Sequence, residues 1–422
     1  MTLGLLPDGA APEARLLLAS RGLRAFGDGL VSLLFPVYLA QLGFGAFQIG
    51  LLATATMTGS AILTLLVGVY AHRFAGRRLL IAAALLMIAT GLAFILVDAF
   101  WPLLLIAFVG TLNPSSGDVS VFLPLEQSQL ARSVADRERT SLFARYSLIG
   151  SLAAASGALC AGVPEILADR FEDGLKPALE IAFLLYALLG LAALALYHRL
   201  PVVPAGSAAA PSEPLRKSRR IVLVLAALFS LDSFAGGFVV QSLLALWLFE
   251  RFGLSLATAG AIFFWTGVLS ALSYLVAVRI ARRIGLINTM VFTHLPANLC
   301  LLLVPFMPSL GLAIALLLIR SALSQMDVPT RTSYVMAVVT PGERSAAASV
   351  TAVPRSLAAA ASPMLAGSLL AMSGFGWPLV IGGGLKILYD LLLLAMFRKV
   401  RPPEEIQSTA PQRSSRSRLP EA

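Results

Sequence analysis

Several ionisable side chains lie inside long apolar segments of this 422-residue sequence. An ionised group costs roughly 3 kcal/mol or more in an apolar environment, so it is retained mainly where it pairs with another charge or binds something. The candidates for binding a proton or a solute are Asp28, Asp118, Asp232, Arg320 and Arg355. The candidates for an ion pair or a gate are Glu126, Asp327 and Arg331.

Asp28 lies between two glycines in an apolar segment that also contains Pro36 and Tyr38. A carboxyl group in such a segment can load and release a proton, because burial disfavours its charged form. The alternative is a structural ion pair with Arg21 or Arg24, which precede it on the same predicted helix.

Asp118 ends the segment Asn-Pro-Ser-Ser-Gly-Asp at 113–118. Pro114 lacks an amide hydrogen and Gly117 tolerates unusual dihedral angles, so we expect a helix to bend or unwind here. Either Asp118 binds a solute or proton in a wet cavity, or its carboxylate and the serines satisfy the backbone groups that the bend releases.

Two carboxylate–base pairs have the four-residue spacing of an intrahelical ion pair. Asp327 precedes Arg331, and Lys386 precedes Asp390. A structural pair is the leading interpretation for both.

The remaining candidates stand alone in their apolar segments. Arg320 and Arg355 each either neutralise a carboxylate or bind an anionic solute, and Asp232 is a candidate for facing a cavity. The sequence does not decide between these alternatives.

Motifs of enzymes, metals and cofactors are missing from the sequence. It contains no GxxxxGK[ST] phosphate loop, so ATP does not power the chain directly. The three histidines, His72, His198 and His294, are scattered, and Cys160 and Cys300 lie within apolar runs. We therefore predict no enzyme, no metal site and no cofactor.

The composition indicates a membrane protein. Apolar residues make up 58% of the chain and charged residues 13%, with a mean hydropathy of +0.85. A soluble protein needs a more polar exterior, whereas a helix of about 20 apolar residues crosses a bilayer. Twelve such helices are predicted, at 18–42, 47–71, 79–97, 102–131, 141–162, 177–197, 221–247, 256–280, 287–306, 310–338, 345–372 and 379–396.

The distribution of arginine and lysine predicts the orientation. Basic residues gather in the breaks after even-numbered spans and in the tail, while the opposite side holds only Arg170, Lys176 and Arg251. The formal charge of +10 thus fits the positive-inside rule rather than nucleic-acid binding. Both termini are expected in the cytoplasm, with the chain in the inner (cytoplasmic) membrane.

Internal similarity indicates a duplication. At an offset of about 205 residues, Pro124 falls on Pro329 and Glu126 on Arg331. The opposite charges of Glu126 and Arg331 suggest a gate between the halves that closes when the cavity opens outward. The predicted units are a six-helix bundle at 1–198, a cytoplasmic linker at 199–220, a second six-helix bundle at 221–398 and a disordered tail at 399–422.

A loop between the second and third predicted spans carries a family resemblance. The segment GVYAHRFAGRR at 68–78 resembles the signature loop of the major facilitator superfamily, through Gly68, Arg73, Gly76, Arg77 and Arg78. The resemblance implies an all-α fold of twelve transmembrane helices in two six-helix pseudo-repeats, with the substrate site between the halves.

Two residues depart from the signature. His72 stands where the family usually has an aspartate, and Ala75 is inserted before Gly76. In the family that aspartate helps to lock the cytoplasmic side, so the lock must differ here. His72 is either a solvated loop residue or a source of pH-sensitive gating.

Together these features predict a secondary active transporter of a small solute, working by alternating access. Plentiful intramembrane carboxylates favour proton coupling, and the resemblance favours export of a drug, a metabolite or a toxic oxyanion or metalloid such as arsenite. The alternatives are a nutrient or vitamin importer and, in another class, a non-transporting membrane sensor or assembly protein. The expected partners are the solute, protons and the lipid bilayer, with no nucleic acid, and the chain is expected to be monomeric.

Overall fold

The computed structural model describes residues 11–70, 73–115, 120–134, 139–168, 174–202 and 215–398. Every regular element in these ranges is helical. The first half contains α1 (Pro12–Gln41), α2 (Ala46–Tyr70), α3 (Gly76–Leu96), α4 (Phe100–Val109), α5 (Phe122–Leu130), α6 (Arg139–Leu159), α7 (Val163–Ala168) and α8 (Leu175–His198). The second half contains α9 (Arg219–Gly237), α10 (Gln241–Phe252), α11 (Leu256–Ile284), α12 (Leu286–Leu303), α13 (Leu310–Ser324), α14 (Asp327–Val338), α15 (Arg344–Met372) and α16 (Trp377–Phe397).

The predicted all-helical membrane architecture is confirmed. Among the described residues, ten helical segments are long and apolar enough to cross a membrane, and each corresponds to one of the twelve predicted spans. The other two predictions fall on α4 with α5 and on α15. The first pair is interrupted, and α15 is a continuous helix of 29 residues that carries Arg344 and Arg355. The count of twelve therefore stays a prediction.

The bend predicted around Pro114 is present. Helix α4 ends at Val109, and α5 begins only at Phe122. Within the break, the side chain of Asn113 accepts a hydrogen bond from the backbone amide of Ser115 at 3.1 Å. This side-chain contact competes with helical hydrogen bonding, as asparagine commonly does at turns.

Two further breaks were not predicted. One separates α13 from α14 at Gln325 and Met326, and the other separates α9 from α10 after Gly237. Pro329 is the third residue of α14, as Pro124 is the third residue of α5. A proline in the first turn costs no helical hydrogen bond, so these matched prolines favour a new helix start at the same place in each half.

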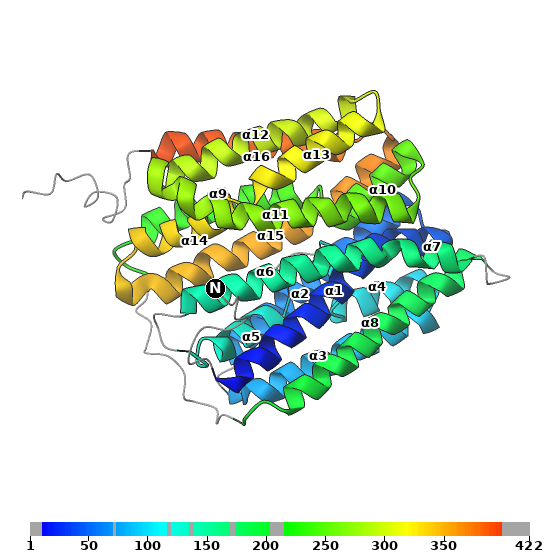
Figure 1. Ribbon diagram of the computed structural model, residues 1–422. Helices are drawn as coiled ribbons and strands as arrows, with labels where there is room; N and C mark the ends of the chain where they lie inside the picture. Colours follow the sequence, from blue (N-terminus) through cyan, green and yellow to red (C-terminus); the bar gives the residue numbers. More distant parts are fainter. Residues whose placement is uncertain are drawn as a thin grey trace, which may run out of the picture.

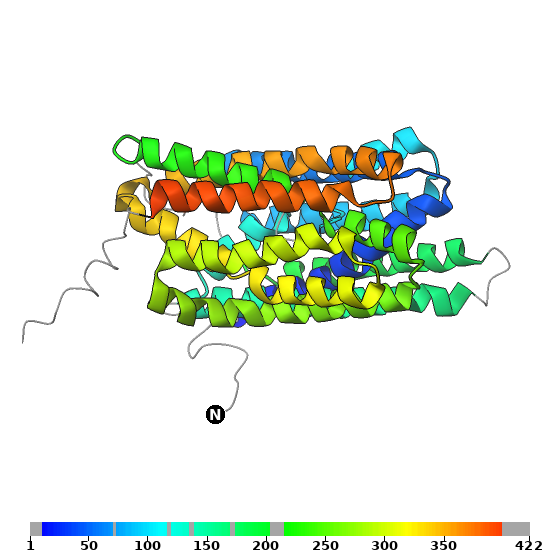
Figure 2. The same ribbon diagram turned by 90° about the horizontal axis from the view of Figure 1, so that it is seen from above.

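The same helix pairs pack in both halves. Helix α1 contacts α6 and α8, as α9 contacts α15 and α16, and α3 contacts α8 as α12 contacts α16. The contacts between the halves also repeat, because α2 packs on α15 and α6 packs on α11. Figure 1 shows the first half below the second, with α6, α11 and α15 along their boundary. Figure 2 shows the same bundle from above.

The halves approach most closely near one end of the bundle. A Cβ added to Gly50 of α2 would lie 2.6 Å from the carbonyl oxygen of Pro363 and 2.9 Å from Cα of Gly367. On the other side of the boundary, a Cβ on Gly260 of α11 would lie 2.7 Å from the carbonyl oxygen of Ala158. Small residues thus allow backbone-to-backbone packing where α2 and α11 begin.

Hydrogen bonds between the halves gather at the same end. They join Gln241 to Ser32 at 2.9 Å, Ser242 to the carbonyl of Pro114 at 3.0 Å, Met364 to Thr54 at 2.8 Å and Ala257 to Glu165 at 3.3 Å. In the predicted orientation this is the outer end, away from the arginine-rich loops.

Candidate functional site: a polar cavity between the halves

A cavity of about 450 Å³ lies between the two halves. Both contribute to its wall, the first through α1, α2 and α6 and the second through α9, α10, α11, α13, α15 and α16. Its charged lining residues are Arg21, Asp28, Asp232, Arg320 and Lys386. Three of the five predicted solute or proton candidates therefore share one cavity.

Asp28 faces this cavity from α1. Its side chain is largely buried, at 9% exposed, and forms no hydrogen bond or ion pair with another described residue. Of the two arginines considered as partners, Arg24 is bound elsewhere, and Arg21 lies 5.1 Å from the ring centre of Tyr146. Asp28 is therefore a largely buried acid of the cavity wall that forms no direct ion pair with a described residue.

Arg24 and Glu126 form a buried ion pair inside the first half. Glu126, at 0% exposed, also accepts hydrogen bonds from Tyr146 and Tyr197 at 2.5 Å each and from Ser20 at 3.0 Å. Helices α1, α5, α6 and α8 thus meet at one fully satisfied carboxylate.

The structure does not bring Glu126 and Arg331 together. Each pairs inside its own half, Glu126 with Arg24 and Arg331 with Asp232 and Asp327. The proposed gate would form in the state that is open outward, whereas the halves here are joined at the predicted outer end. It stays a prediction for the other state.

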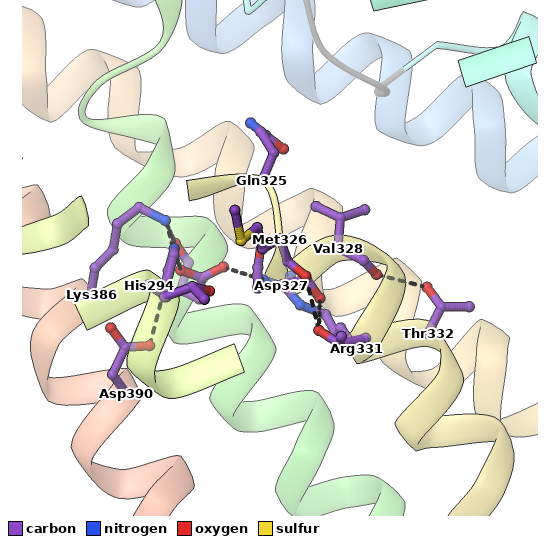
Figure 3. Close-up of polar contacts among 12 residues, drawn as sticks. His294, Gln325, Met326, Asp327, Val328, Arg331, Thr332, Lys386 and Asp390 are labelled. Carbon is purple, nitrogen blue, oxygen red and sulfur yellow. Dashed lines mark hydrogen bonds and ion pairs between the residues drawn. The ribbon is translucent and has the colours of Figure 1, made fainter. Parts of the chain in front are cut away.

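A larger network of buried charges lies inside the second half (Figure 3). It consists of Asp232, His294, Asp327, Arg331, Lys386 and Asp390. The two oxygens of Asp232 accept hydrogen bonds from different bases: Oδ1 lies 2.7 Å from Nζ of Lys386, and Oδ2 lies 2.9 Å from Arg331. Arg331 also pairs with Asp327, which is the intrahelical pair expected from their spacing. Asp232 thus links the cavity wall to the interior of the half.

The network continues to a histidine on α12. Nδ1 of His294 lies 2.9 Å from Oδ1 of Asp390, and Asn298 donates a hydrogen bond to Oδ2 of Asp390 at 2.8 Å. Nε2 of His294 lies 4.0 Å from Oδ1 of Asp232. His294 therefore stands between the cavity-lining carboxylate and a carboxylate that is fully buried.

The expected pair of Lys386 and Asp390 is wrong. Lys386 pairs with Asp232 across to α9, and Asp390 pairs with His294 across to α12. Residues four apart on a helix share a face. Here, however, α16 packs on α9 and α12, and each of the two side chains has its partner on one of those helices.

His294 and Asn298 are functional candidates that the sequence analysis missed. The signal was present, because both are polar, four residues apart and inside an apolar span. The sequence does not show their role by itself, because the partner of His294 is a carboxylate on a span that is distant along the chain.

The two halves carry mirrored ion pairs of opposite polarity. In the first half the base is on α1 and the acid on α5, as Arg24 and Glu126. In the second half the acid is on α9 and the base on α14, as Asp232 and Arg331. The duplicated architecture thus retains a buried pair at the same helix contact with its charges exchanged.

The other predicted residues that the structure describes are not part of the cavity lining. Arg355 on α15 is half-buried and is not part of the lining. In the signature loop, Gly76 begins α3 so close to α5 that an added Cβ would lie 2.3 Å from the side-chain nitrogen of Gln129. Asp118 and His72 lie outside the described residues. Gly68 lies in the last turn of α2, and the Arg73 guanidinium lies over the Tyr70 ring. Arg77 and Arg78 are in the first turn of α3.

The fold and its central cavity define a membrane transporter built from two similar halves. The sequence model of the Major Facilitator Superfamily matches residues 17–350. The chain therefore belongs to the major facilitator superfamily, as the signature loop predicted, and it is a transporter of some solute and not an enzyme.

Individual relatives agree with this assignment. The chain is 25% identical over 426 residues to the uncharacterized membrane protein YJR124C of Saccharomyces cerevisiae, covering 92% of this chain and 94% of the yeast protein. The solved structure of the nucleoside transporter NupG matches with a TM-score of 0.70 at 14% identity, covering 92% of this chain and 99% of that one. A D-xylose-proton symporter matches with a TM-score of 0.70 at 17% identity, covering 90% and 96%. At these identities the two structures show the shared fold alone.

Proposed function

We propose that the chain is a proton-coupled secondary transporter that moves a small solute by alternating access of the central cavity. The observation that carries proton coupling is the continuous contact from the cavity-lining pair Asp232–Lys386 to His294 and Asp390. The chain also shares its fold with a D-xylose-proton symporter.

A charge count supports a proton in this network. Among the described residues, its three carboxylates, Asp232, Asp327 and Asp390, form direct ion pairs with two permanent cations, Arg331 and Lys386. Leaving a buried carboxylate without a counter-charge is costly, and imidazole is the side chain that titrates near neutral pH. A proton on the His294–Asp390 pair balances the network. The other groups in reach are Tyr389, whose ring packs on His294, and Arg320 on the cavity side.

Loss of that proton would change the charge of the cavity wall. Deprotonation leaves Asp390 without a cation, and Lys386 precedes it by one helical turn on α16. Transfer of Lys386 from Asp232 to Asp390 would leave a carboxylate of the cavity wall with one base instead of two. Proton loading would thereby alter the charge that a solute meets.

The proposed direction of transport is export, and the proposed location is the cell membrane. The closed outer end and the arginine-rich loops support a cavity that opens on the cytoplasmic side of the cell membrane, with both termini in the cytoplasm. The halves then rock about the cavity to open it outward. A cytoplasm-facing resting cavity suits export of a solute from the cell.

The test is solute-dependent proton flux in proteoliposomes that contain a trapped pH-sensitive dye. Nucleosides, pentoses, organic acids and organic cations are each added across an imposed pH gradient. We expect solutes of one class to drive proton flux through the wild type, and we expect H294Q to reduce this flux at least tenfold. The matched control is H198Q, at an exposed histidine at the end of α8, which should retain it. Absence of solute-dependent proton flux across all four classes would sink the proposal.

A further inference from the structure

Arg320 is a cationic residue of the cavity that forms no ion pair with any described residue. It lies near the end of α13 and lines the cavity, and the structure gives it no ion pair and no hydrogen bond to a described residue. Its Nε is buried and has no hydrogen-bond partner. A guanidinium stays charged at any physiological pH, so this position presents a permanent positive charge.

The neighbouring acids are not available to neutralise it. Both oxygens of Asp232 already accept hydrogen bonds, from Lys386 and from Arg331. The other cavity-lining carboxylate, Asp28, belongs to α1 in the opposite half and forms no ion pair with Arg320. Lys386 therefore has a direct ion pair with Asp232, whereas Arg320 has no direct ion pair with a described residue.

Polar groups surround Arg320 on its own wall of the cavity. Ser321, Ser324 and Gln325 follow it along the chain and line the cavity with it. From α11, Thr266, Ser270 and Tyr274 recur every four residues and so present one face of that helix. Polar side chains and a fixed cation thus lie together in one region of the cavity wall.

The cavity becomes apolar beyond this region. Along α11, the lining changes from Ile262 and Phe263 to Thr266 within one turn. Val240, just before α10, and Leu244 of α10 extend the apolar part of the wall. The cavity therefore has an apolar end and a polar, cationic end.

We infer that the transported solute is a small organic acid whose anionic group binds Arg320 and whose apolar body lies against Val240, Leu244, Ile262 and Phe263. This inference rests on the proposed transport function and names its substrate class. The guanidinium fits a carboxylate because two parallel N–H groups can meet two oxygens. The hydroxyl of Ser324 and the side-chain amide nitrogen of Gln325, on the same wall of the cavity, can donate hydrogen bonds to the remaining lone pairs of that anion.

The test measures binding, which needs neither a gradient nor flux. Thermal unfolding of the purified full chain in detergent is followed at constant ionic strength with two matched sets of probes. The first set is benzoate, benzamide and benzylamine, and the second is nicotinate, nicotinamide and 3-picolylamine. We expect the acid of at least one set to raise the Tm saturably and to bind at least tenfold more tightly than its amide and amine.

Variants of Arg320 separate recognition from folding. R320Q should lose at least tenfold of the affinity for the acid, and R320K, which keeps the charge without the planar fork, should lose less. The matched control is R145Q on α6, an arginine with a partnerless nitrogen that lies outside the cavity lining and should leave binding unchanged.

The outcomes are distinguishable from those of the transport test. Acid binding that depends on Arg320 without proton-coupled flux would support this inference and contradict the proposed function. The inference is overturned if amide or amine binds as tightly as acid, if no acid stabilises the wild type, or if R320Q and R145Q behave alike.

Discussion

At the scale of single residues, Glu126 is a buried carboxylate whose two oxygens are fully hydrogen-bonded. Four donors from Ser20, Arg24, Tyr146 and Tyr197 converge on its two oxygens, and no part of the side chain is exposed. Such a group stabilises the fold only while every member is present, because each removed partner leaves a buried polar atom unsatisfied.

We therefore expect E126Q to destabilise the protein strongly. The substitution leaves Arg24 buried at 1% exposed without its counter-ion, and breaking a buried pair typically costs about 3–5 kcal/mol. The change should appear as a large fall in the Tm of the detergent-solubilised protein. The double variant R24M/E126M, which removes both charges, should recover part of that loss.

The matched control is the exposed pair Asp98–Lys176, where the nitrogen lies 2.9 Å from the oxygen. The side chains there are 58% and 35% exposed, so D98N should change stability by no more than about 1 kcal/mol. Equal Tm losses for E126Q and D98N would contradict the argument that burial sets the energy of these pairs.

At the scale of elements, one carboxylate connects the segment before α9 to the start of α15. Glu343, in the short turn Pro341–Glu343, accepts the backbone amides of Arg216, Lys217 and Ser218 at 2.6, 2.8 and 3.1 Å. These hydrogen bonds lower the pKa of Glu343 from its ordinary 4.5 to about 2. The carboxylate thus holds the segment that leads into α9 against the start of α15.

This contact should make stability depend on pH in a defined window. Since the folded-state pKa is the lower one, the stabilisation is complete above about pH 4.5 and is lost as the pH falls towards 2. E343Q should therefore lower the Tm at pH 7, and its difference from the wild type should shrink as the pH falls below 4.5. A difference that stays constant from pH 7 to pH 3 would show that the carboxylate charge is not what holds this segment.

At the scale of the whole molecule, the sequence predicted the membrane spans and their duplication, but among the buried charges it predicted only the local pair Asp327–Arg331 and not the partners on other helices. Hydropathy is a local property, and ten of the predicted spans could be located from it. The contact between Lys386 and Asp232 depends instead on how α9 and α16 pack, which no local spacing encodes. The cavity residues Asp28, Asp232 and Arg320 were found because a charge inside an apolar run is conspicuous. His294 was missed because a histidine becomes informative only beside its carboxylate.

The contacts between the halves predict how the molecule can be moved out of this state. Gly50 and Gly367 let α2 and α15 touch at the closed end, and a Cβ on Gly50 would lie 2.6 Å from a backbone carbonyl. Since backbone cannot move aside as a flexible side chain can, G50V should weaken this closure and favour the outward-open state. G311A, at a glycine with no atoms within 4 Å of an added Cβ, is the matched control.

Labelling of a cavity residue from each side of the membrane measures the shift. Ser151 lines the cavity, so S151C in a background without Cys160 and Cys300 reports access of a membrane-impermeant maleimide. Labelling should come chiefly from the cytoplasmic side in the parent, and G50V should raise labelling from the outer side several-fold while G311A does not. If G50V leaves both rates unchanged, the glycine contact is not the closure, and the halves must be held by the hydrogen bonds of Ser32, Pro114, Thr54 and Glu165 instead.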